Sequence, residues 1–369
     1  MTIAFVCNSL NPDLVSYFYA KLRIPEQEVG ARLLWFGNRR AAPPSGVRVR
    51  TSSVSRSSGF SALFFLDCLI SCYVIAVLLW QRVRFVIFDT AHVSNLPVAL
   101  WCKLFGIRTV FTIHDWEPHP GRRSAVIGLY NRFCRNYLAD RIIVFSGVEF
   151  EGVPLTRLRL SGFEHRTQEQ ARNPYFLFFG RIEPYKGLAN LLEIAQLLER
   201  QSPGHAIWVA GQGRDPSLPR LMERPNVRVI NRFIDQAELD ALFGGATATL
   251  LPYDSASQSG VAVLSYAYDT PVVAFDVGSL AEYIEPGLSG ELVPHRDCRG
   301  FVARMLQVEK ELPRYVTHIR DGFEERYGRS ALVAQYSELL RQLNPSPEGP
   351  HAASCADDGR LPSSPGTRM

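Results

Sequence analysis

The chain has 369 residues, of which 46% are hydrophobic and 21% are charged, and its net charge at pH 7 is +4. This length exceeds the size at which one hydrophobic core stops growing, and the apolar share is enough for two cores, so we expect two domains. Seven cysteines without a CxxC pair argue against both a disulfide framework and a structural zinc site. We expect a cytoplasmic protein without a secretory leader, because the first residues read as a strand with no basic region before it.

Apolar runs alternate with helical patterns along the chain, which predicts parallel sheets built from βαβ units. In the first half, strands are predicted over residues 3–7, 31–36, 85–88, 109–113 and 141–145. In the second half, strands are predicted over residues 175–179, 206–210, 227–230, 247–251 and 271–274. The predicted fold class is therefore α/β, with two doubly wound parallel sheets in tandem.

The pattern also predicts where the domains begin and end. We expect a first domain over residues 1–162, a linker poor in apolar residues over 163–174, and a second domain over 175–328. A terminal helix is predicted over 329–343. The tail over 344–369 is rich in Pro, Ser, Gly and Ala, so it cannot bury a core and should be disordered.

The charge is unevenly distributed between the two halves. Residues 1–160 hold 19 Lys and Arg against 10 Asp and Glu, whereas the remaining residues hold 21 against 26. A basic first half suits anionic lipid headgroups, a polyprenyl diphosphate or nucleic acid. Nucleic acid ranks last, because no nucleic-acid reading motif accompanies the charge. A solvated basic surface without a partner is the alternative explanation.

The run from residue 60 to residue 80 contains a single charge, Asp67, among 21 residues. That length approaches the roughly 20 apolar residues that span a membrane. However, the run lies between two predicted strands of one sheet, and crossing the bilayer would separate them. We expect a mostly buried helix whose outer face contacts the membrane interface beside Arg56, Arg82 and Arg84. A pure core helix and a spanning helix are the alternatives.

The strongest functional signal follows the strand predicted at 175–179. That strand ends at Gly180, and Arg181 and Lys186 then precede a helical pattern over 188–198. A helix amino terminus offers unpaired amide groups and a partial positive charge, and the two cations add further donors, so a phosphate would be well held here. Two solvated cations on a surface loop are the alternative.

The run Gly-Arg-Ile-Glu-Pro-Tyr-Lys-Gly at 180–187 resembles the donor-phosphate loop of glycosyltransferase family 4, the retaining enzymes of the GT-B fold. Further motifs agree in order and spacing at 209–213, 231–234, 248–253 and 271–274, with Gly278 and Glu282. The resemblance covers residues 173–325 well and the first half loosely. It implies two Rossmann-like domains facing a central cleft, the first binding the acceptor and the second the nucleotide sugar.

The resemblance also implies roles for individual residues. The donor-binding residues it implies are Gly180, Arg181, Lys186, Gly211, Gly213, Phe233, Ser257, Gln258, Ser259, Gly260, Val261 and Glu282. His114 falls at the family's histidine that faces the donor sugar, with Asp115 beside it, and we assign both as catalytic. His92 and His119 are assigned to the acceptor side, since active sites lie outside the carboxyl ends of parallel strands. The alternatives are a structural histidine and a metal site that uses Asp115, Glu117 and His119.

One departure from the family pattern concerns two glutamates that usually stand eight positions apart. They fall on Ala256 and Leu264 here, and neither side chain can make a charge-assisted hydrogen bond to a sugar hydroxyl. What remains is a small polar loop over 257–261, whose side chains and amides can meet phosphate or sugar oxygens at the start of a helix. Glu282 is a candidate to replace one ribose contact.

The predicted function is that of a retaining glycosyltransferase that moves a hexose from a nucleotide sugar to a lipid-linked or surface-polysaccharide acceptor. The chain contains no DxD triad, so we predict no metal and no cofactor, with Arg181, Lys186 and a helix end stabilising the leaving diphosphate. The predicted location is the inner face of the cell membrane, with peripheral contact to anionic lipid and no nucleic-acid partner. A catalytically weak homologue that binds a nucleotide sugar or a partner protein, and a nucleotide-sugar epimerase, are the alternatives.

Overall fold

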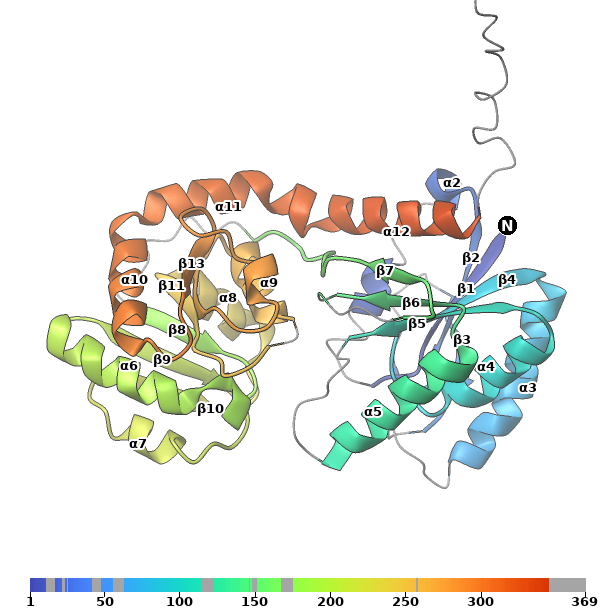
Figure 1. Ribbon diagram of the computed structural model, residues 1–369, viewed down its shortest axis with the longest axis horizontal. Helices are drawn as coiled ribbons and strands as arrows, with labels where there is room; N and C mark the ends of the chain where they lie inside the picture. The colour runs from blue at the N-terminus through green and yellow to red at the C-terminus, as the bar shows by residue number, and fades with distance from the viewer. Residues whose placement is uncertain are drawn as a thin grey trace, which may run out of the picture.

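The computed structural model describes residues 1–10, 17–21, 24, 26–41, 48–55, 63–114, 122–145, 147, 151–166, 175–256 and 258–344. Two parallel sheets lie side by side, and helices α11 (Leu312–Arg326) and α12 (Arg329–Leu343) run along one side of both (Figure 1). Most of the predicted linker, from residue 167, and nearly all of the predicted tail, from residue 345, lie outside the described residues. The predicted α/β class with two doubly wound sheets is confirmed.

The first sheet has seven strands in the order β3-β2-β1-β4-β5-β6-β7, with every pair parallel. Its strands are β1 (Thr2–Cys7), β2 (Arg32–Asn38), β3 (Arg50–Ser53), β4 (Val83–Phe88), β5 (Arg108–Ile113), β6 (Arg141–Val144) and β7 (Leu155–Arg157). Side chains on β1 alternate between two cores, with Ile3 and Phe5 on one face and Ala4 and Val6 on the other. Burial on both faces explains why these strands read as continuous apolar runs.

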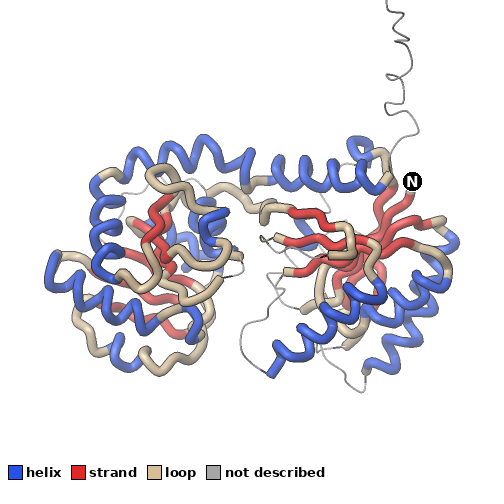
Figure 2. Tube along the Cα trace, in the orientation of Figure 1, coloured by secondary structure: helices blue, strands red, loops and turns tan. Residues whose placement is uncertain are grey.

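Different helices cover the two faces of this sheet. Helices α3 (Phe64–Trp80), α4 (Asn95–Leu104) and α5 (Arg122–Phe133), with the π-helix η2 (Cys134–Leu138), pack on the face that holds Ala4 and Val6. The short α2 (Glu26–Val29) and the terminal helix α12 cover the opposite face. Helix α12 buries Leu332, Tyr336 and Leu340 in the core of the first domain, so the chain returns to this domain after completing the second (Figure 2).

The second sheet has six parallel strands in the order β10-β9-β8-β11-β12-β13. They are β8 (Tyr175–Phe179), β9 (Ala206–Gly211), β10 (Val227–Asn231), β11 (Ala248–Leu251), β12 (Val272–Phe275) and β13 (Gly290–Val293). The other elements of this domain are α6 (Leu188–Gln201), α7 (Leu218–Met222), α8 (Gln236–Gly245), α9 (Gly260–Ala267), α10 (Cys298–Lys310) and the 3-10 helices η3 (Pro184–Lys186) and η4 (Leu280–Glu282). Helix α8 begins with a capping box between Asp235 and Glu238, which satisfies amides that a helix end leaves unpaired.

Candidate active site

The loop after β8 lies tightly against the end of β9. Gly211 adopts φ 144°, and a Cβ at this position would lie 1.8 Å from the carbonyl oxygen of Gly180. Ile182 then pairs with Gly213 in an isolated parallel bridge. Because a side chain at Gly211 would displace backbone rather than a flexible group, glycine is required for this approach.

The same loop also packs against the segment that follows β11. Gly187 has φ 71°, and a Cβ there would lie 1.8 Å from the carbonyl oxygen of Pro252. The amide of Asp254 donates to the carbonyl oxygen of Tyr185 at 2.9 Å. Loops from the carboxyl ends of β8 and β11 therefore form one unit, at the edge of a parallel sheet where ligands bind.

The two predicted phosphate-binding cations have different surroundings. Lys186 Nζ donates to the hydroxyl of Tyr253 at 2.9 Å and lies 4.0 Å from the centre of its ring. Burial raises the pKa of Tyr253, so the phenol stays neutral. Arg181 is 71% exposed, and its guanidinium lies 3.1 Å from Glu183 Oε1. One cation is thus held in place by an aromatic ring, and the other is exposed and paired with Glu183.

The amino terminus of α9 faces this loop. The Cγ2 atom of Val261 lies 3.5 Å from the place a Cβ would take at Gly180. Ser259 caps the helix, since its hydroxyl accepts from the amide of Ala262 at 3.2 Å. Gln258 Oε1 is buried and has no hydrogen-bond partner among the described residues, which makes it an acceptor suited to a ligand hydroxyl.

The loops after β9 and β10 form a further part of the site. Gly213 and Asn231 exchange two hydrogen bonds, at 3.1 Å from the Gly213 amide and 3.2 Å to its carbonyl oxygen. Phe233 is 72% exposed and offers a ring for stacking. Beside it, hydrogen bonding from Arg232 lowers the pKa of Glu238 to about 2, which keeps this carboxylate charged.

In the first domain, His114 follows β5. A ring nitrogen, Nε2, lies 2.9 Å from the carbonyl oxygen of Asp89, and because a carbonyl only accepts, Nε2 carries the hydrogen. The His114 ring stacks on Phe145 with 5.1 Å between the ring centres. His92 is buried, and its Nδ1 accepts from the amide of Ser94 at 3.2 Å, so it supports the turn between β4 and α4. His92 is thus a buried residue, and its acceptor-side role stays a prediction.

Three of the predicted site residues, Asp115, His119 and Ser257, lie outside the described residues, and their roles stay predictions. Within the part of the chain that is described, no group of three or more His, Cys, Asp and Glu side chains is placed to hold a metal ion.

A buried ion pair that the sequence did not reveal lies beneath His114. Lys21 Nζ lies 2.6 Å from Asp89 Oδ1, and both side chains are almost fully buried. The ammonium group also lies 4.4 Å from the ring centre of Tyr17 and 4.8 Å from that of Tyr336, which comes from α12. No sequence signal points to this pair, because its parts are distant along the chain.

The two halves of the site meet at η4. The hydroxyl of Tyr283, just after η4, donates to the carbonyl oxygen of Phe145 at 3.0 Å. The carboxylate of the exposed Glu282 points to the neighbouring loop, since a Cβ at Gly147 would lie 2.8 Å from its Oε1. Because Phe145 stacks on His114, one contact joins the donor-side loops to the histidine of the first domain.

The comparisons with known proteins agree with this geometry. Residues 173–311 match the family model described as glycosyl transferases group 1. The match lies in the second domain, so this part of the chain is similar to that family. The glycogen synthase of Mycobacterium tuberculosis H37Rv is 31% identical over 235 residues, covering 58% of this chain and 57% of that protein. The putative colanic acid biosynthesis glycosyltransferase WcaL of Salmonella typhimurium is 25% identical over 207 residues, covering 52% of this chain and 50% of WcaL.

Likeness to solved structures extends over most of the chain. Anabaena Alr3699/HepE, solved in complex with UDP and glucose, superposes with a TM-score of 0.66 at 16% sequence identity. The match covers 93% of this chain and 100% of that structure. At such low identity the likeness shows the fold alone, and the predicted GT-B fold is confirmed.

Proposed function

We propose that this protein is a retaining glycosyltransferase that moves a hexose from a nucleotide sugar to a lipid-linked or surface-polysaccharide acceptor, without a metal or cofactor. The observation that carries the proposal is the convergence of three elements at one sheet edge. The loop with Arg181 and Lys186 lies against the start of α9, and η4 joins this edge to the loop beside His114.

The donor diphosphate would lie between the 180–187 loop and the start of α9. Lys186 is already placed there by Tyr253, and the exposed Arg181 can turn towards a phosphate with its fork of donors. The first amides of α9 add further donors and the positive end of a helix. These groups would stabilise the negative charge that grows on the departing diphosphate, the role a metal has in other glycosyltransferases.

Sugar recognition would then depend on the loop before α9 and on His114. The Oε1 atom of Gln258 would accept from a sugar hydroxyl, which removes the cost of burying this oxygen without a partner. Since Nε2 of His114 carries a hydrogen bonded to Asp89, the ring has a fixed orientation.

The transfer itself forms a bond between the acceptor oxygen and the anomeric carbon as the bond from that carbon to the diphosphate breaks. In the proposed retaining mechanism the acceptor hydroxyl attacks from the face that the diphosphate leaves, and its proton passes to the departing phosphate oxygen. Closure of the two domains would exclude water, which would otherwise hydrolyse the donor.

The comparisons support the choice of substrate class. HepE was solved with UDP and glucose, and WcaL is named for colanic acid biosynthesis, so a nucleotide sugar and a polysaccharide precursor are the natural candidates. The basic first half supports an anionic, lipid-linked acceptor at the inner face of the membrane. The donor base and the linkage formed are left to experiment.

The first test is thermal unfolding of the full chain with UDP, GDP, ADP and their hexose conjugates. A ligand that binds only the folded state stabilises it, by about 2.7 kcal/mol at a concentration 100 times its Kd. One nucleotide should raise the melting temperature, and Arg181→Ala or Lys186→Ala should remove the shift. Arg220→Ala, a change at an exposed arginine on α7, is the matched control and should keep it. A folded protein that responds to no nucleotide would contradict the proposal.

A second candidate function is favoured by Ala256 and Leu264, which replace the two sugar-binding glutamates of the family. A homologue of this kind would bind the nucleotide sugar without transferring it. Incubation of the protein with the donor and membrane extract, followed by mass spectrometry of the products, distinguishes the three candidate functions. A glycosylated lipid supports transfer, an unchanged donor supports binding alone, and a changed sugar without an acceptor supports an epimerase.

A further inference from the structure

Helix α3 is arranged with its polar side chains inward. Asp67 is completely buried, where its Oδ1 accepts from the amide of Val54 at 2.7 Å and its Oδ2 accepts from the hydroxyls of Ser55 and Ser94, each at 2.5 Å. Ser71, on the same inner side, accepts from the indole of Trp101 at 3.1 Å. A helix on the surface of a water-soluble domain normally shows the opposite arrangement, with its polar residues outward.

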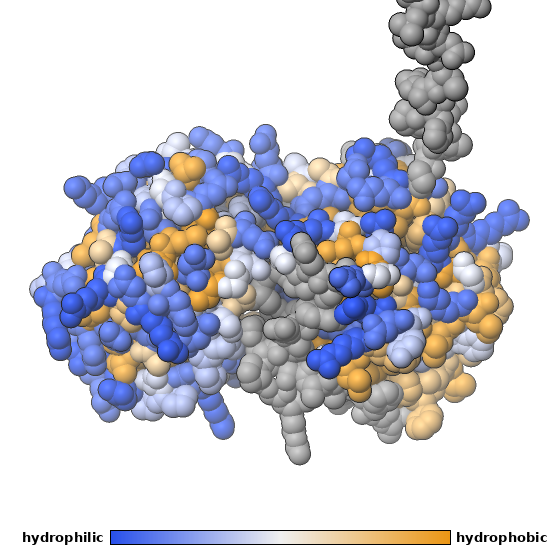
Figure 3. All heavy atoms as spheres, in the orientation of Figure 1, coloured by the Kyte–Doolittle hydropathy of each residue, from blue (hydrophilic) through white to orange (hydrophobic). Residues whose placement is uncertain are grey.

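The outward side of α3 is apolar along its whole length, and exposed apolar residues continue at the end of α4. We call it the outer apolar face, and its main residues are Phe65, Leu69, Tyr73 and Trp80 of α3, with Leu104 and Phe105 at the end of α4. Leu69 is 70% exposed and Trp80 is 80% exposed. Figure 3 shows hydrophobic atoms gathered over this part of the first domain. Single exposed apolar residues are common, but a contiguous set of this size marks an interaction surface.

The chain that forms the outer apolar face and its neighbouring elements carries more basic than acidic residues. Residues 63–114 and 122–145 contain nine Lys and Arg and three acidic residues. Of these acids, Asp67 and Asp89 are buried, and Asp140 is paired with Lys103 at 2.7 Å. In these two ranges the basic residues therefore outnumber the acidic ones, and only Asp140 among the three acids is not buried.

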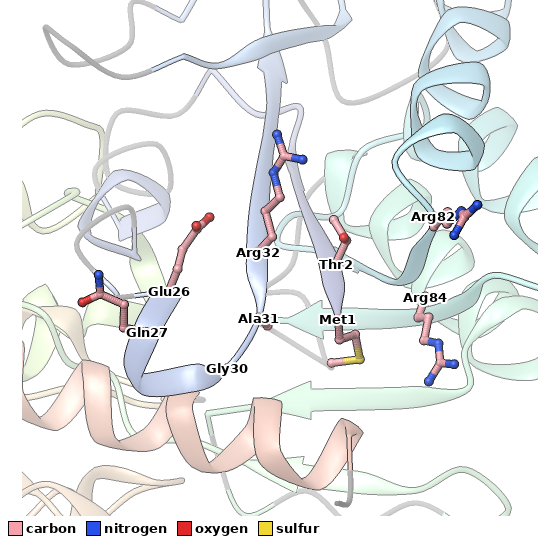
Figure 4. Close-up of a pocket in the computed structure, with 9 residues that line it drawn as sticks. All are labelled: Met1, Thr2, Glu26, Gln27, Gly30, Ala31, Arg32, Arg82 and Arg84. Atoms are coloured by element: carbon pink, nitrogen blue, oxygen red, sulfur yellow. The ribbon is translucent and has the colours of Figure 1, made fainter.

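Cations also follow Trp80 directly. Arg82 and Arg84, with Arg32 of β2, line an open hollow of about 590 Å³ at the amino edge of the first sheet (Figure 4). Glu26 lies in the same hollow, but its Oε1 accepts from the amide of Leu33 at 2.6 Å. The hollow lies at the amino edge of the sheet, whereas His114 follows the carboxyl end of β5, so the hollow is separate from the candidate active site.

We propose that the outer apolar face, with Arg82 and Arg84, is the surface by which this protein docks on an anionic lipid bilayer. The proposal deepens the proposed function, on which it rests for a lipid-linked acceptor. Apolar and aromatic side chains enter the interface while arginines meet anionic headgroups, as in proteins that lie on a membrane. A second copy of the chain is a poorer occupant, because two faces of like charge repel each other.

The same helix indicates that the protein would lie on the membrane surface and not cross it. Helix α3 has 17 residues, and no helix among the described residues is long and apolar enough to cross a membrane. The hydrogen bonds of Asp67 and Ser71 also tie α3 to the rest of its domain. The sequence predicted that this helix contacts the membrane interface. The proposal now limits that contact to the outward side of α3 and the adjoining end of α4.

The test is flotation of the full chain with vesicles of phosphatidylcholine, with and without the anionic lipid phosphatidylglycerol. Binding should require the anionic lipid. The double variant Arg82→Gln/Arg84→Gln should partition roughly 30-fold more weakly, the factor that two lost cations give at an anionic surface. Leu69→Ser/Trp80→Ser should weaken binding by at least about tenfold, through lost apolar contact. The matched control is Arg220→Gln/Met222→Ser, which changes exposed residues of α7 and should bind as the native protein does.

Several outcomes would overturn this inference. They are equal binding to neutral vesicles, no binding to either vesicle, binding that the face variants leave unchanged, and a dimer that the face variants dissociate. Nucleotide-dependent thermal shifts, recorded on the same variants, separate the two proposals. Lost vesicle binding with an intact nucleotide shift is a failure of the docking surface alone, whereas intact vesicle binding with no nucleotide shift in any variant is a failure of the proposed function.

Discussion

The buried pair of Lys21 and Asp89 gives the sharpest prediction on stability. Its nitrogen and oxygen lie 2.6 Å apart, and Lys21 is completely buried. Burial, opposed by the charge of Asp89, lowers the pKa of Lys21. Replacing the lysine alone, as in Lys21→Met, leaves the Asp89 carboxylate without its counter-ion inside the protein.

Breaking such a pair costs about 3–5 kcal/mol, because the remaining charge loses its partner and stays away from water. For a domain of this size we expect the melting temperature to fall by roughly 6–20 °C. The chain provides a matched comparison in Lys103 and Asp140, whose nitrogen and oxygen lie 2.7 Å apart but whose side chains are about one-third exposed. Lys103→Met should cost only about 0–1 kcal/mol.

The assay is urea unfolding of the native protein and both variants, followed by circular dichroism. A third variant, Lys21→Met/Asp89→Asn, removes both charges and should recover part of the loss, since no ion is then buried alone. The reasoning is refuted if Lys21→Met and Lys103→Met differ by less than about 1 kcal/mol in unfolding free energy, because burial would then not decide the cost.

Three further predictions concern other parts of the second domain and the cysteines. Gly211→Ala should lower the free energy of unfolding by at least about 2 kcal/mol and abolish the nucleotide-dependent thermal shift, because its Cβ would meet a backbone oxygen. The control is Gly204→Ala, since a Cβ at Gly204 meets nothing within 4 Å. Equal losses of stability in the two variants would contradict the argument. Hydrogen bonds from Tyr268 and Gln236, with Arg166, hold the pKa of Asp240 below its ordinary value, so its contribution to stability is present above the unfolded pKa of about 4 and is lost as pH falls. Melting temperatures between neutral pH and pH 3 should therefore fall less steeply in Asp240→Asn than in the native protein, and parallel curves would contradict this. Burial raises the pKa values of Cys7, Cys102 and Cys134 to about 12, so these thiols should not react with an alkylating reagent until the protein unfolds. Mass spectrometry after alkylation of the folded protein should find the exposed Cys72 modified and the three buried cysteines unmodified.

Much of the fold could be predicted from sequence because its signals are local. The ten predicted strands are apolar runs, and their predicted bounds lie within two residues of the observed ones. The short strands β3, β7 and β13 were not predicted, because their residues are partly polar and give no apolar run. The 180–187 loop could likewise be located from sequence, since Gly180, Arg181 and Lys186 stand at fixed positions between a strand and a helix.

The remaining features depend on residues that are far apart along the chain. Sequence alone marked Asp67 as one charge in an apolar run, but only the tertiary structure placed Ser55 and Ser94 around it and turned the apolar side of α3 outward. Nothing in the sequence indicated that Lys21 is buried, and only the tertiary structure places it beside Asp89 and Tyr336 in the core.

The candidate active site also combines features that local sequence predicts with features that depend on long-range contacts. Residue order determined the two sheets and the position of the 180–187 loop, because backbone preference and apolar periodicity act over a few neighbouring residues. The contact of Tyr283 with the carbonyl oxygen of Phe145, which joins that loop to His114, spans 138 positions of sequence. Such contacts form only when one domain packs against the other. Long-range partners depend on shape and burial in the folded chain, and local sequence patterns do not reveal them.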